Sequence, residues 1–228
     1  MRMRVKTGVW ISYQVVGQGP PLLLLHGNGE DHRIFAEAAR ELARDFTVYL
    51  PDSRCHGKSQ KTEKIGYREM AADMISLVEQ LEIRKPLICG FSDGGIVALL
   101  MAVARPALPA GLILCGANAT PRGLKARCRL SFRLQWWKTR DPLVGMMLRE
   151  PRISRRMLEA ISVPVLVLAG SRDLIRRSHT RALAKAIPGS KLRILPGETH
   201  GSYVVHSRKL CPWIRAFWQQ LPKRASAT

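Results

Sequence analysis

The fold of this chain is decided by the stretch Pro86-Leu87-Ile88-Cys89-Gly90-Phe91-Ser92-Asp93-Gly94-Gly95-Ile96-Val97-Ala98-Leu99-Leu100-Met101-Ala102. An apolar strand leads into a serine held between two glycines, and an apolar helix follows it. A turn this tight predicts a strained backbone at Ser92, because a side chain at Gly90 or Gly94 would collide with the neighbouring element. The hydroxyl is then exposed at the end of a sheet, and the Asp93 N–H points to where a substrate oxyanion would form. The alternative is an ordinary glycine-rich turn.

Size and composition favour one packed α/β domain. The chain has 228 residues, of which 46% are hydrophobic, enough for a core without disulfides or metals. Five scattered cysteines without a C-x-x-C pair indicate a reducing compartment. The N-terminal residues lack the apolar run of a secretory signal, and no apolar run approaches the roughly 18 residues of a membrane span. We expect a soluble, cytoplasmic protein, and the oligomeric state stays open.

The charge balance is strongly basic. There are 37 Lys and Arg against 17 Asp and Glu, a formal charge of +20 and a pI near 10.7. Such a charge is compatible with nucleic acid, an anionic membrane surface or an acidic substrate, but also with a merely solvated surface. The basic residues are spread over the whole chain and no nucleic-acid-binding module accompanies them. We therefore expect no specific nucleic-acid partner.

Apolar strand-like runs alternate with helical periodicity along the chain. This order requires crossover connections and predicts a mostly parallel sheet with helices on both faces. The whole chain, 1–228, is expected to form this single domain, with a frayed tail at 222–228. Strands are expected at 9–16, 22–25, 46–50, 86–89, 111–115, 163–169 and 191–195, and helices at 34–44, 67–82, after the serine to about 105, and at 204–220.

The segment 118–160 breaks the alternation. It has no clear strand, and it lies between two strands of the expected sheet, so we interpret it as an insertion whose short helices form a small lid over Ser92. Trp136 and Trp137 are expected to contact the substrate there. Eleven residues of the segment are basic and three are acidic. These arginines and lysines either contact an anionic substrate or lipid surface, or face water.

A serine hydroxyl needs a base, and the base needs a carboxylate that orients it. Both should lie in loops after later strands, because parallel sheets bind ligands at the carboxyl ends of their strands. Asp173 follows the strand at 163–169, and His200 follows the strand at 191–195. The order Ser92, Asp173, His200 is that of a serine hydrolase triad on an α/β sheet.

The first central strand runs into the turn His26-Gly27-Asn28-Gly29. Its backbone can face the serine, so the Asn28 N–H is the expected second oxyanion donor, with that of Gly29 as the alternative. Gly27 and Gly29 would then lie beside the substrate. We interpret His26 as a side chain that braces this loop.

Together these motifs resemble the α/β-hydrolase superfamily over about residues 8–220, and most of all its small bacterial esterase-like members with a reduced lid. The motifs that carry the resemblance are His26–Gly29, Asp52–Ser59, Gly90–Gly95, Asp173 and His200. The resemblance implies that Ser92 is the nucleophile, His200 the general base and Asp173 its partner. It also implies an oxyanion hole made by the Asn28 and Asp93 amides.

The chain departs from the family pattern at Cys55, where a glycine is usual. If that position needs a positive φ, the cysteine is strained, and we interpret it as structural. Serine in the turn disfavours the dehalogenase and epoxide hydrolase branches, which carry aspartate there. No metal-ligand spacing and no Rossmann or Walker glycine pattern is present, so no metal or cofactor is expected. Three further histidines, His56, His179 and His206, are isolated in the sequence and are expected at the surface.

The function predicted from these motifs is hydrolysis of small or short-acyl carboxylic esters through an acyl-enzyme intermediate. The same triad also serves lactonases, C–C hydrolases and acyltransferases, and the catalytic residues do not separate these reactions. A further alternative is a hydrolase-like protein that binds a ligand without turning it over.

Overall fold

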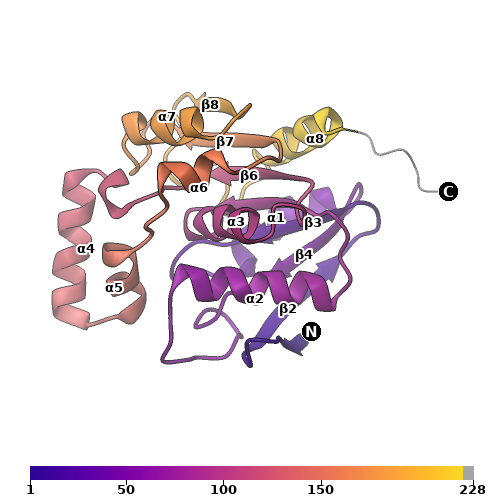
Figure 1. Cartoon of the computed structure of the whole chain (residues 1–228), viewed down its shortest axis with the longest axis horizontal. Coiled ribbons are helices and arrows are strands. Elements are labelled where there is room, and N and C mark those ends of the chain that lie inside the picture. Colours follow the sequence, from indigo (N-terminus) through magenta and orange to yellow (C-terminus); the bar gives the residue numbers. More distant parts are fainter. Residues whose placement is uncertain (223–228) are drawn as a thin grey trace.

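The computed structural model describes residues 1–222, so the expected frayed tail lies outside it except for Pro222 (Figure 1). These residues form an eight-stranded sheet with the order β1-β2-β4-β3-β5-β6-β7-β8. β2 pairs antiparallel with β1 and β4, and the other neighbours are parallel, which confirms the predicted mostly parallel sheet. The strands are β1 (Arg2–Arg4), β2 (Trp10–Val16), β3 (Pro21–Leu25), β4 (Thr47–Pro51), β5 (Leu87–Phe91), β6 (Gly111–Cys115), β7 (Val165–Gly170) and β8 (Lys191–Leu195).

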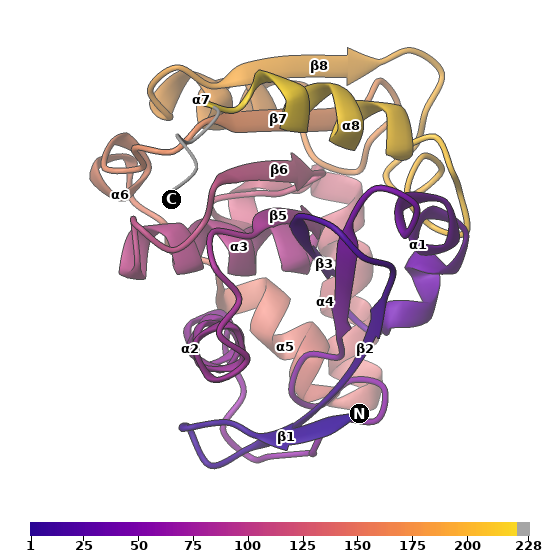
Figure 2. The same ribbon diagram turned by 90° about the vertical axis from the view of Figure 1, so that its right-hand side faces the viewer.

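Helices cover both faces of the sheet, as predicted (Figure 2). Successive residues of a strand point to opposite faces, so Leu23 and Leu25 pack into a core with α2, α3 and α7. Leu22 and Leu24 pack into a second core with α1 and α8. The helices are η1 (His32–Phe35), α1 (Ala36–Leu42), α2 (Tyr67–Gln80), α3 (Asp93–Ala104), η2 (Pro121–Gly123), α4 (Ala126–Thr139), α5 (Pro142–Arg149), α6 (Arg155–Glu159), α7 (Arg177–Ala186) and α8 (Cys211–Gln220).

The strands that carry the site are the central ones. All residues of β5, β6 and β7 are buried, as their unbroken apolar sequence predicts for strands covered on both faces. The edge strand β8 alternates between exposed and half-buried residues before Leu195. The carboxyl ends of β3, β5, β7 and β8 therefore come to one rim of a rigid sheet, where their loops meet.

The segment 118–160 contains η2, α4, α5 and α6 and no strand. In Figure 1, α4 and α5 lie side by side at one end of the molecule, outside the layers that sandwich the sheet. None of the 14 residues of α4 is buried. This helix therefore has one side available to solvent along its whole length.

Most boundaries lie within about two residues of the sequence prediction, and two elements differ more. The closing helix begins at Cys211 rather than at 204, because the chain after His200 first forms turns in which the N–H groups of Val204 and Val205 donate to the Gly201 carbonyl. The short edge strand β1 was not predicted, since its sequence Arg-Met-Arg has too few residues to show an alternation. None of the helices in residues 1–222 combines the length and the apolar character that a bilayer crossing requires.

Candidate active site

Ser92 lies in the turn between β5 and α3. Its backbone has φ 52° and ψ −115°, a left-handed conformation that is strained for a residue with a side chain. The turn is packed too closely to relax, because a Cβ at Gly94 would lie 2.1 Å from the carbonyl oxygen of Leu25. The Ser92 N–H donates to the Cys115 carbonyl at 2.8 Å, which ties the turn to β6. The predicted strain at the serine is therefore present, with the packing that causes it.

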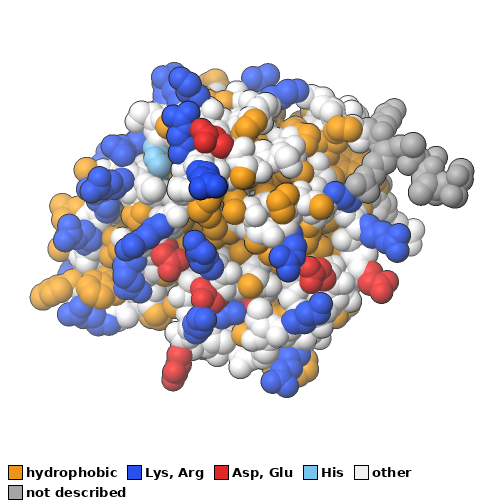
Figure 3. Space-filling model, in the orientation of Figure 1, with side chains coloured by type: hydrophobic (Ala, Val, Ile, Leu, Met, Phe, Trp, Pro, Cys, Tyr) orange, Lys and Arg blue, Asp and Glu red, His pale blue; other side chains and the backbone are white. Residues whose placement is uncertain are grey.

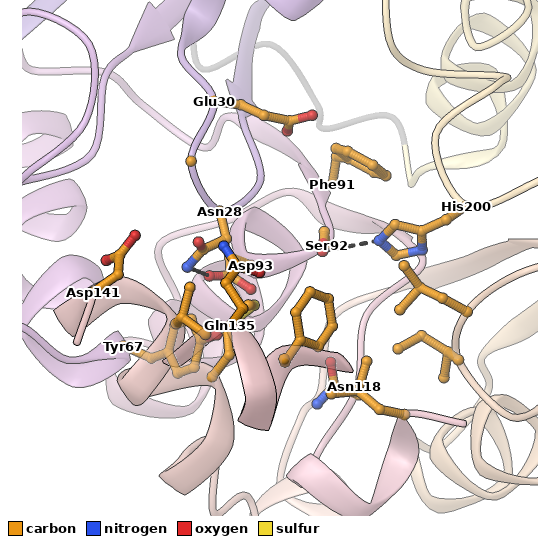
Figure 4. A pocket seen from close by; sticks show the side chains of 17 residues that line it. Asn28, Glu30, Tyr67, Phe91, Ser92, Asp93, Asn118, Gln135, Asp141 and His200 are labelled. Carbon is orange, nitrogen blue, oxygen red and sulfur yellow. Dashed lines mark hydrogen bonds between the residues drawn. The ribbon is translucent and has the colours of Figure 1, made fainter. Parts of the chain in front are cut away.

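The structure brings Ser92, His200 and Asp173 together. His200 Nε2 lies 3.0 Å from Ser92 Oγ, and its Nδ1 lies 2.7 Å from Asp173 Oδ1 (Figure 4 shows the serine and the imidazole). The second distance is that of a charge-assisted hydrogen bond. The hydroxyl, the imidazole and the carboxylate thus form one continuous hydrogen-bonded relay.

The loop that carries His200 crosses the end of β7. A Cβ at Gly170 would lie 2.3 Å from the Glu198 carbonyl oxygen, so only glycine lets the two backbones approach this closely. The Arg172 N–H donates to the same carbonyl at 2.9 Å. The imidazole also packs on the Phe91 ring, with 5.0 Å between the ring centroids. These contacts fix the ring before any substrate arrives.

Asp173 is almost fully buried and stays ionised. Burial by itself raises the pKa of this carboxyl, but the hydrogen bond and charge of His200 and the backbone N–H of Ile175 more than offset it and lower the pKa below its ordinary value. The Ile175 N–H donates to Oδ1 at 2.9 Å. The carboxylate therefore stabilises positive charge on the imidazole.

The loop after β3 faces the serine turn. The Asn28 side chain donates from Nδ2 to Asp93 Oδ2 at 2.8 Å, joining the two loops (Figure 4). Within residues 1–222, the backbone N–H groups of Asn28 and Asp93 donate to no protein acceptor. Both are therefore available to a substrate oxygen. Burial raises the pKa of the Asp93 carboxyl, an effect that the Asn28 hydrogen bond opposes.

His26 holds the base of this loop, as the sequence predicted. Its Nε2 accepts from the Ser53 N–H at 2.9 Å, and its Nδ1 lies 2.8 Å from the Gly27 carbonyl, to which it donates in this tautomer. Burial, reinforced by the neighbouring His56, lowers the pKa of His26 to about 4. The imidazole is therefore neutral at ordinary pH and links the loop after β3 to the loop after β4.

A pocket of about 310 Å³ opens above Ser92 (Figure 4). This volume is at the small end of the range for ligand pockets. Among the described residues that line it, three are acidic and none is Lys or Arg, although the chain carries +20. The lining consists of Asn28, Gly29, Glu30, Tyr67, Phe91, Ser92, Asp93, Asn118, Leu124, Phe132, Gln135, Asp141, Val144, Met147, Leu174, Ile175 and His200.

The two glycines expected beside the substrate differ in position. Gly29 lines the pocket, whereas Gly27 lies just beneath it, where a Cβ would come 3.2 Å from the Ser92 Cβ. Gly27 also donates its N–H to Glu30 Oε2 at 3.0 Å. Its role is thus to let the loop approach the serine, with no contact to the cavity itself.

The tryptophans of the insertion do not line this pocket, which corrects the expectation that Trp136 and Trp137 contact substrate. Phe132 and Gln135 of α4 face the cavity, whereas Trp136 and Trp137 line a separate groove between α4 and α5. The Trp137 side chain is 66% exposed. Trp136 stacks against the Arg140 guanidinium, 4.7 Å from its ring centroid.

Several pocket residues escaped the sequence prediction. Glu30 directly follows the glycine turn, and this proximity is the one feature of the sequence that could have predicted it as a pocket residue. Its carboxyl is partly buried, which raises its pKa above the ordinary value. Tyr67 begins α2, and Phe132, Asp141 and Met147 come from the insertion, whose fold shows no repeating pattern that would place single side chains.

The other histidines are not all at the surface. His206 is exposed, as expected, but His56 is buried: its ring packs 5.1 Å from that of His26, and its Nδ1 hydrogen-bonds the Arg54 carbonyl at 2.9 Å. His179 is half-buried, and its Nε2 accepts from the Ala119 N–H at 3.0 Å. Burial, with the nearby Arg176, lowers the pKa of His179.

One group within residues 1–222 has the composition of a metal site: Asp31, His32 and Asp52, whose ligand atoms lie within 4.8 Å of one another. Protein donors already satisfy these atoms. His32 Nδ1 lies 2.6 Å from Asp52 Oδ1, and the Asp31 carboxylate binds the Arg33 guanidinium. The group is accounted for as the hydrogen-bonded start of η1.

Cys55 has φ 65°, so the position does require the left-handed region that the cysteine was expected to strain. Its sulfur is held by Thr62, whose N–H donates to Sγ at 3.3 Å and whose carbonyl lies 3.4 Å from it. The thiol therefore closes the loop Asp52–Ser59 against the following segment, at a distance from the pocket lining.

Comparison with known proteins gives a match to the family model described as alpha/beta hydrolase fold, over residues 20–145. RutD of Pseudomonas syringae pv. syringae (strain B728a), which is named as a carbamate hydrolase, is 32% identical over 247 residues that cover 89% of this chain and 95% of that protein. Serine hydrolase BPHL of Mus musculus is 28% identical over 229 residues, covering 86% of this chain and 79% of that protein.

Solved structures match over nearly the whole length. The esterase EaEST from Exiguobacterium antarcticum superposes with a TM-score of 0.84 at 19% identity, covering 96% of this chain and 99% of that chain. At such low identity the likeness concerns the fold. The shared fold covers nearly the whole chain, beyond the residues 20–145 that the family model matches.

Proposed function

Since the chain belongs to the alpha/beta hydrolase fold family, we propose that it is a serine hydrolase that cleaves small, uncharged carboxylic esters through an acyl-enzyme intermediate. The observation that carries the proposal is the relay from Ser92 Oγ through His200 to Asp173, with contacts of 3.0 and 2.7 Å. A serine that is strained into a tight turn and hydrogen-bonded to an imidazole is poised to lose its proton during attack.

Acylation in this proposal begins when Ser92 Oγ attacks the ester carbonyl carbon. The new O–C bond forms while the hydroxyl proton passes to His200 Nε2, and the carbonyl oxygen becomes an oxyanion. The tetrahedral intermediate then collapses, the bond to the leaving alkoxide breaks, and His200 returns its proton to that oxygen. The acyl group remains on Ser92 as an ester.

Deacylation repeats the sequence with water. His200 Nε2 takes a proton from the water as its oxygen attacks the acyl carbon, and it then protonates Ser92 Oγ as the acid departs. Asp173 holds the imidazole by Nδ1–H and stabilises its positive form in both halves. The free N–H groups of Asn28 and Asp93 would bind the oxyanion, and one such donor contributes on the order of 3 kcal/mol.

The pocket supports a small substrate without negative charge. Its volume of about 310 Å³ leaves little room beyond a short acyl group and an alcohol. Glu30, Asp93 and Asp141 lie in its wall, and the basic residues of the insertion do not. A carboxylate or phosphate on the substrate would meet these acids without a cationic partner, so we expect anionic esters to be poorer substrates.

The test combines covalent labelling with turnover. A fluorophosphonate probe should label the wild-type chain at Ser92, and an aryl ester series should give the highest kcat/KM for short acyl chains. Ser92→Ala should lose the label and reduce kcat/KM by at least about 10⁴-fold with the melting temperature retained. The exposed Ser178→Ala on α7 is the matched control and should leave both readouts unchanged.

Two outcomes would contradict the proposal. Full turnover by Ser92→Ala would remove the serine from the chemistry. Labelling of Ser92 without hydrolysis of any ester in the series would point to lactone opening, C–C cleavage, acyl transfer or ligand binding on the same residues.

A further inference from the structure

The outer side of α4 carries an apolar stripe that nothing in the described chain covers. Leu130, Leu134 and Trp137 are 58%, 54% and 66% exposed. Their spacing of four and three residues places them in one row along the helix. In residues 1–222 only two other large apolar side chains are exposed, Met1 at 65% and Trp10 at 41%. Figure 3 shows apolar side chains on the outside of α4, at the left edge of the view.

Basic side chains flank this stripe on both sides. By helical geometry, Arg127 and Lys138 lie along one side of the row, and Arg129 and Arg133 lie along the other. α4 contains no acidic residue. Among the ion pairs of residues 1–222, none involves these four groups. Figure 3 shows Lys and Arg side chains above and below the apolar ones.

The stripe is not explained by folding or by the pocket. Phe132 and Gln135, on the opposite side of α4, already line the cavity. Beside the stripe, a groove between α4 and α5 continues the same composition with Leu148, Arg122 and Arg149. Exposed leucines and a tryptophan among arginines cost solubility in water, so their exposure calls for a partner.

We propose that the outer face of α4 docks on an anionic lipid surface. Leucine and tryptophan side chains suit the boundary between headgroups and acyl chains, and lysine and arginine suit the lipid phosphates. Each basic residue near such a surface contributes about 1 kcal/mol. The charge of the face selects the partner: a second copy of the chain would bring two rows of arginines together, and a nucleic acid would leave the leucines uncovered.

If the outer face of α4 contacts the lipid, the sheet lies on the side of the molecule away from it. The pocket lies on the lipid side, because α4 forms part of its wall. The proposal concerns binding alone, so it stands or falls separately from the proposed esterase activity.

The experiment measures binding of the full chain to vesicles by co-sedimentation. Vesicles of phosphatidylcholine with about one third phosphatidylserine are compared with pure phosphatidylcholine vesicles at roughly physiological ionic strength. The wild type should bind the anionic vesicles at least about 10-fold more tightly than the neutral ones. Leu130→Ser/Leu134→Ser should weaken this binding by about 10-fold or more, and Arg129→Gln/Arg133→Gln by about 30-fold.

Matched controls separate this face from general charge and apolarity. Arg181→Gln/Lys185→Gln removes two exposed charges on α7, and Trp10→Ser removes an exposed aromatic ring far from α4. Both should bind anionic vesicles within about 3-fold of the wild type. Hydrolysis of a soluble aryl ester and the melting temperature should stay unchanged in Leu130→Ser/Leu134→Ser, which shows that the variant is folded.

Three results would overturn the proposal. The first is equal loss of vesicle binding in the α7 control and the α4 variants, which would make the attraction a property of the net charge. The second is that the chain does not bind vesicles but sediments as a dimer, and that Leu130→Ser/Leu134→Ser dissociates this dimer. The partner of the stripe would then be a second copy of the chain. The third is that the chain binds a 30-mer RNA but not vesicles, and that Arg129→Gln/Arg133→Gln abolishes the RNA binding. The partner would then be a nucleic acid.

Discussion

A single buried imidazole, His26, connects the loop that faces Ser92 to the loop after β4. Its two ring nitrogens are engaged by the Ser53 N–H and the Gly27 carbonyl, and burial lowers its pKa to about 4. The unfolded chain takes up a proton on this residue near pH 6.5, while the folded chain does so only near pH 4. Between these values the unfolded state binds more protons, so stability rises with pH.

The prediction is that lowering the pH from 6.5 toward 4 removes about 3 kcal/mol of unfolding free energy through His26 alone. His26→Asn should abolish this part of the pH dependence, because asparagine does not titrate. The variant should also be less stable than the wild type at pH 7. Urea unfolding at several pH values measures the slope. His206→Asn, at an exposed histidine, should keep the wild-type slope; equal slopes in His26→Asn and the wild type would refute the assignment.

Cys55 shows how a residue can occupy an unfavourable conformation when other contacts hold it. A non-glycine residue in the left-handed region costs roughly 1–2 kcal/mol. The hydrogen bonds of its sulfur with the Thr62 backbone, at 3.3 and 3.4 Å, offset part of that cost. The departure from the family pattern is therefore confined to a loop that supports the site from outside, and the three residues of the relay are untouched by it.

At the scale of elements, the decisive contact is between the serine turn and the end of β3. A Cβ at Gly94 would lie 2.1 Å from the Leu25 carbonyl oxygen and 2.7 Å from that of His26, and neither backbone atom can move without disturbing the sheet. We predict that Gly94→Ala lowers the unfolding free energy by about 1–3 kcal/mol and reduces the proposed aryl ester turnover by at least about 100-fold, because α3 must shift away from the loop after β3.

Gly189→Ala is the control for this prediction. Gly189 has φ 65° and open space around its missing Cβ, so alanine there meets strain in the backbone but no clash. Its cost should stay near 1 kcal/mol, with turnover unchanged. Denaturant unfolding and aryl ester kinetics on both variants decide the matter. Normal turnover in Gly94→Ala would mean that the turn is not held by this packing.

The extent of sequence prediction follows from which elements have a repeating pattern. The buried strands and Gly90–Gly94 are predictable because apolar runs bounded by turn residues favour buried strands, and a strand, paired glycines and a helix in succession favour a tight turn. The insertion was located but its side chains were not, because α4 is apolar on two opposite sides. Phe132 faces the pocket and Trp137 faces solvent, and apolar residues on two opposite sides of a helix do not say which side packs.

The same reasoning explains the errors at the chain ends. The closing helix was extended back to 204 because Val204 and Val205 are apolar, yet they form turns that cover Tyr203 beside the His200 loop. β1 holds its place by pairing Arg2 with Ser12 and Arg4 with Trp10, a backbone interaction that side-chain patterns do not encode.

At the scale of the whole molecule, the charge of +20 acts against the compact state. The positive residues outnumber the negative ones by more than two to one, so most of them lack a partner. The ion pairs that do form are mostly exposed and contribute little. Repulsion among the excess positive charges therefore outweighs the attraction in these pairs.

Salt screens both the repulsion among like charges and the attraction within exposed ion pairs. Whichever of the two is larger therefore decides whether added salt stabilises or destabilises the protein. We predict that raising NaCl from about 20 to 200 mM stabilises the protein by about 1 kcal/mol, or roughly 2–4 °C in melting temperature for a chain of this size.

The variant Arg181→Glu tests whether charge repulsion is the cause. Residue 181 lies four residues from both Arg177 and Lys185 on α7. The substitution therefore changes two repulsive interactions into two attractive ones. This variant should melt higher than the wild type at low salt and gain less from added NaCl. Arg181→Gln should lie between them, and a melting temperature that falls with salt in the wild type would show that the exposed pairs outweigh the net charge.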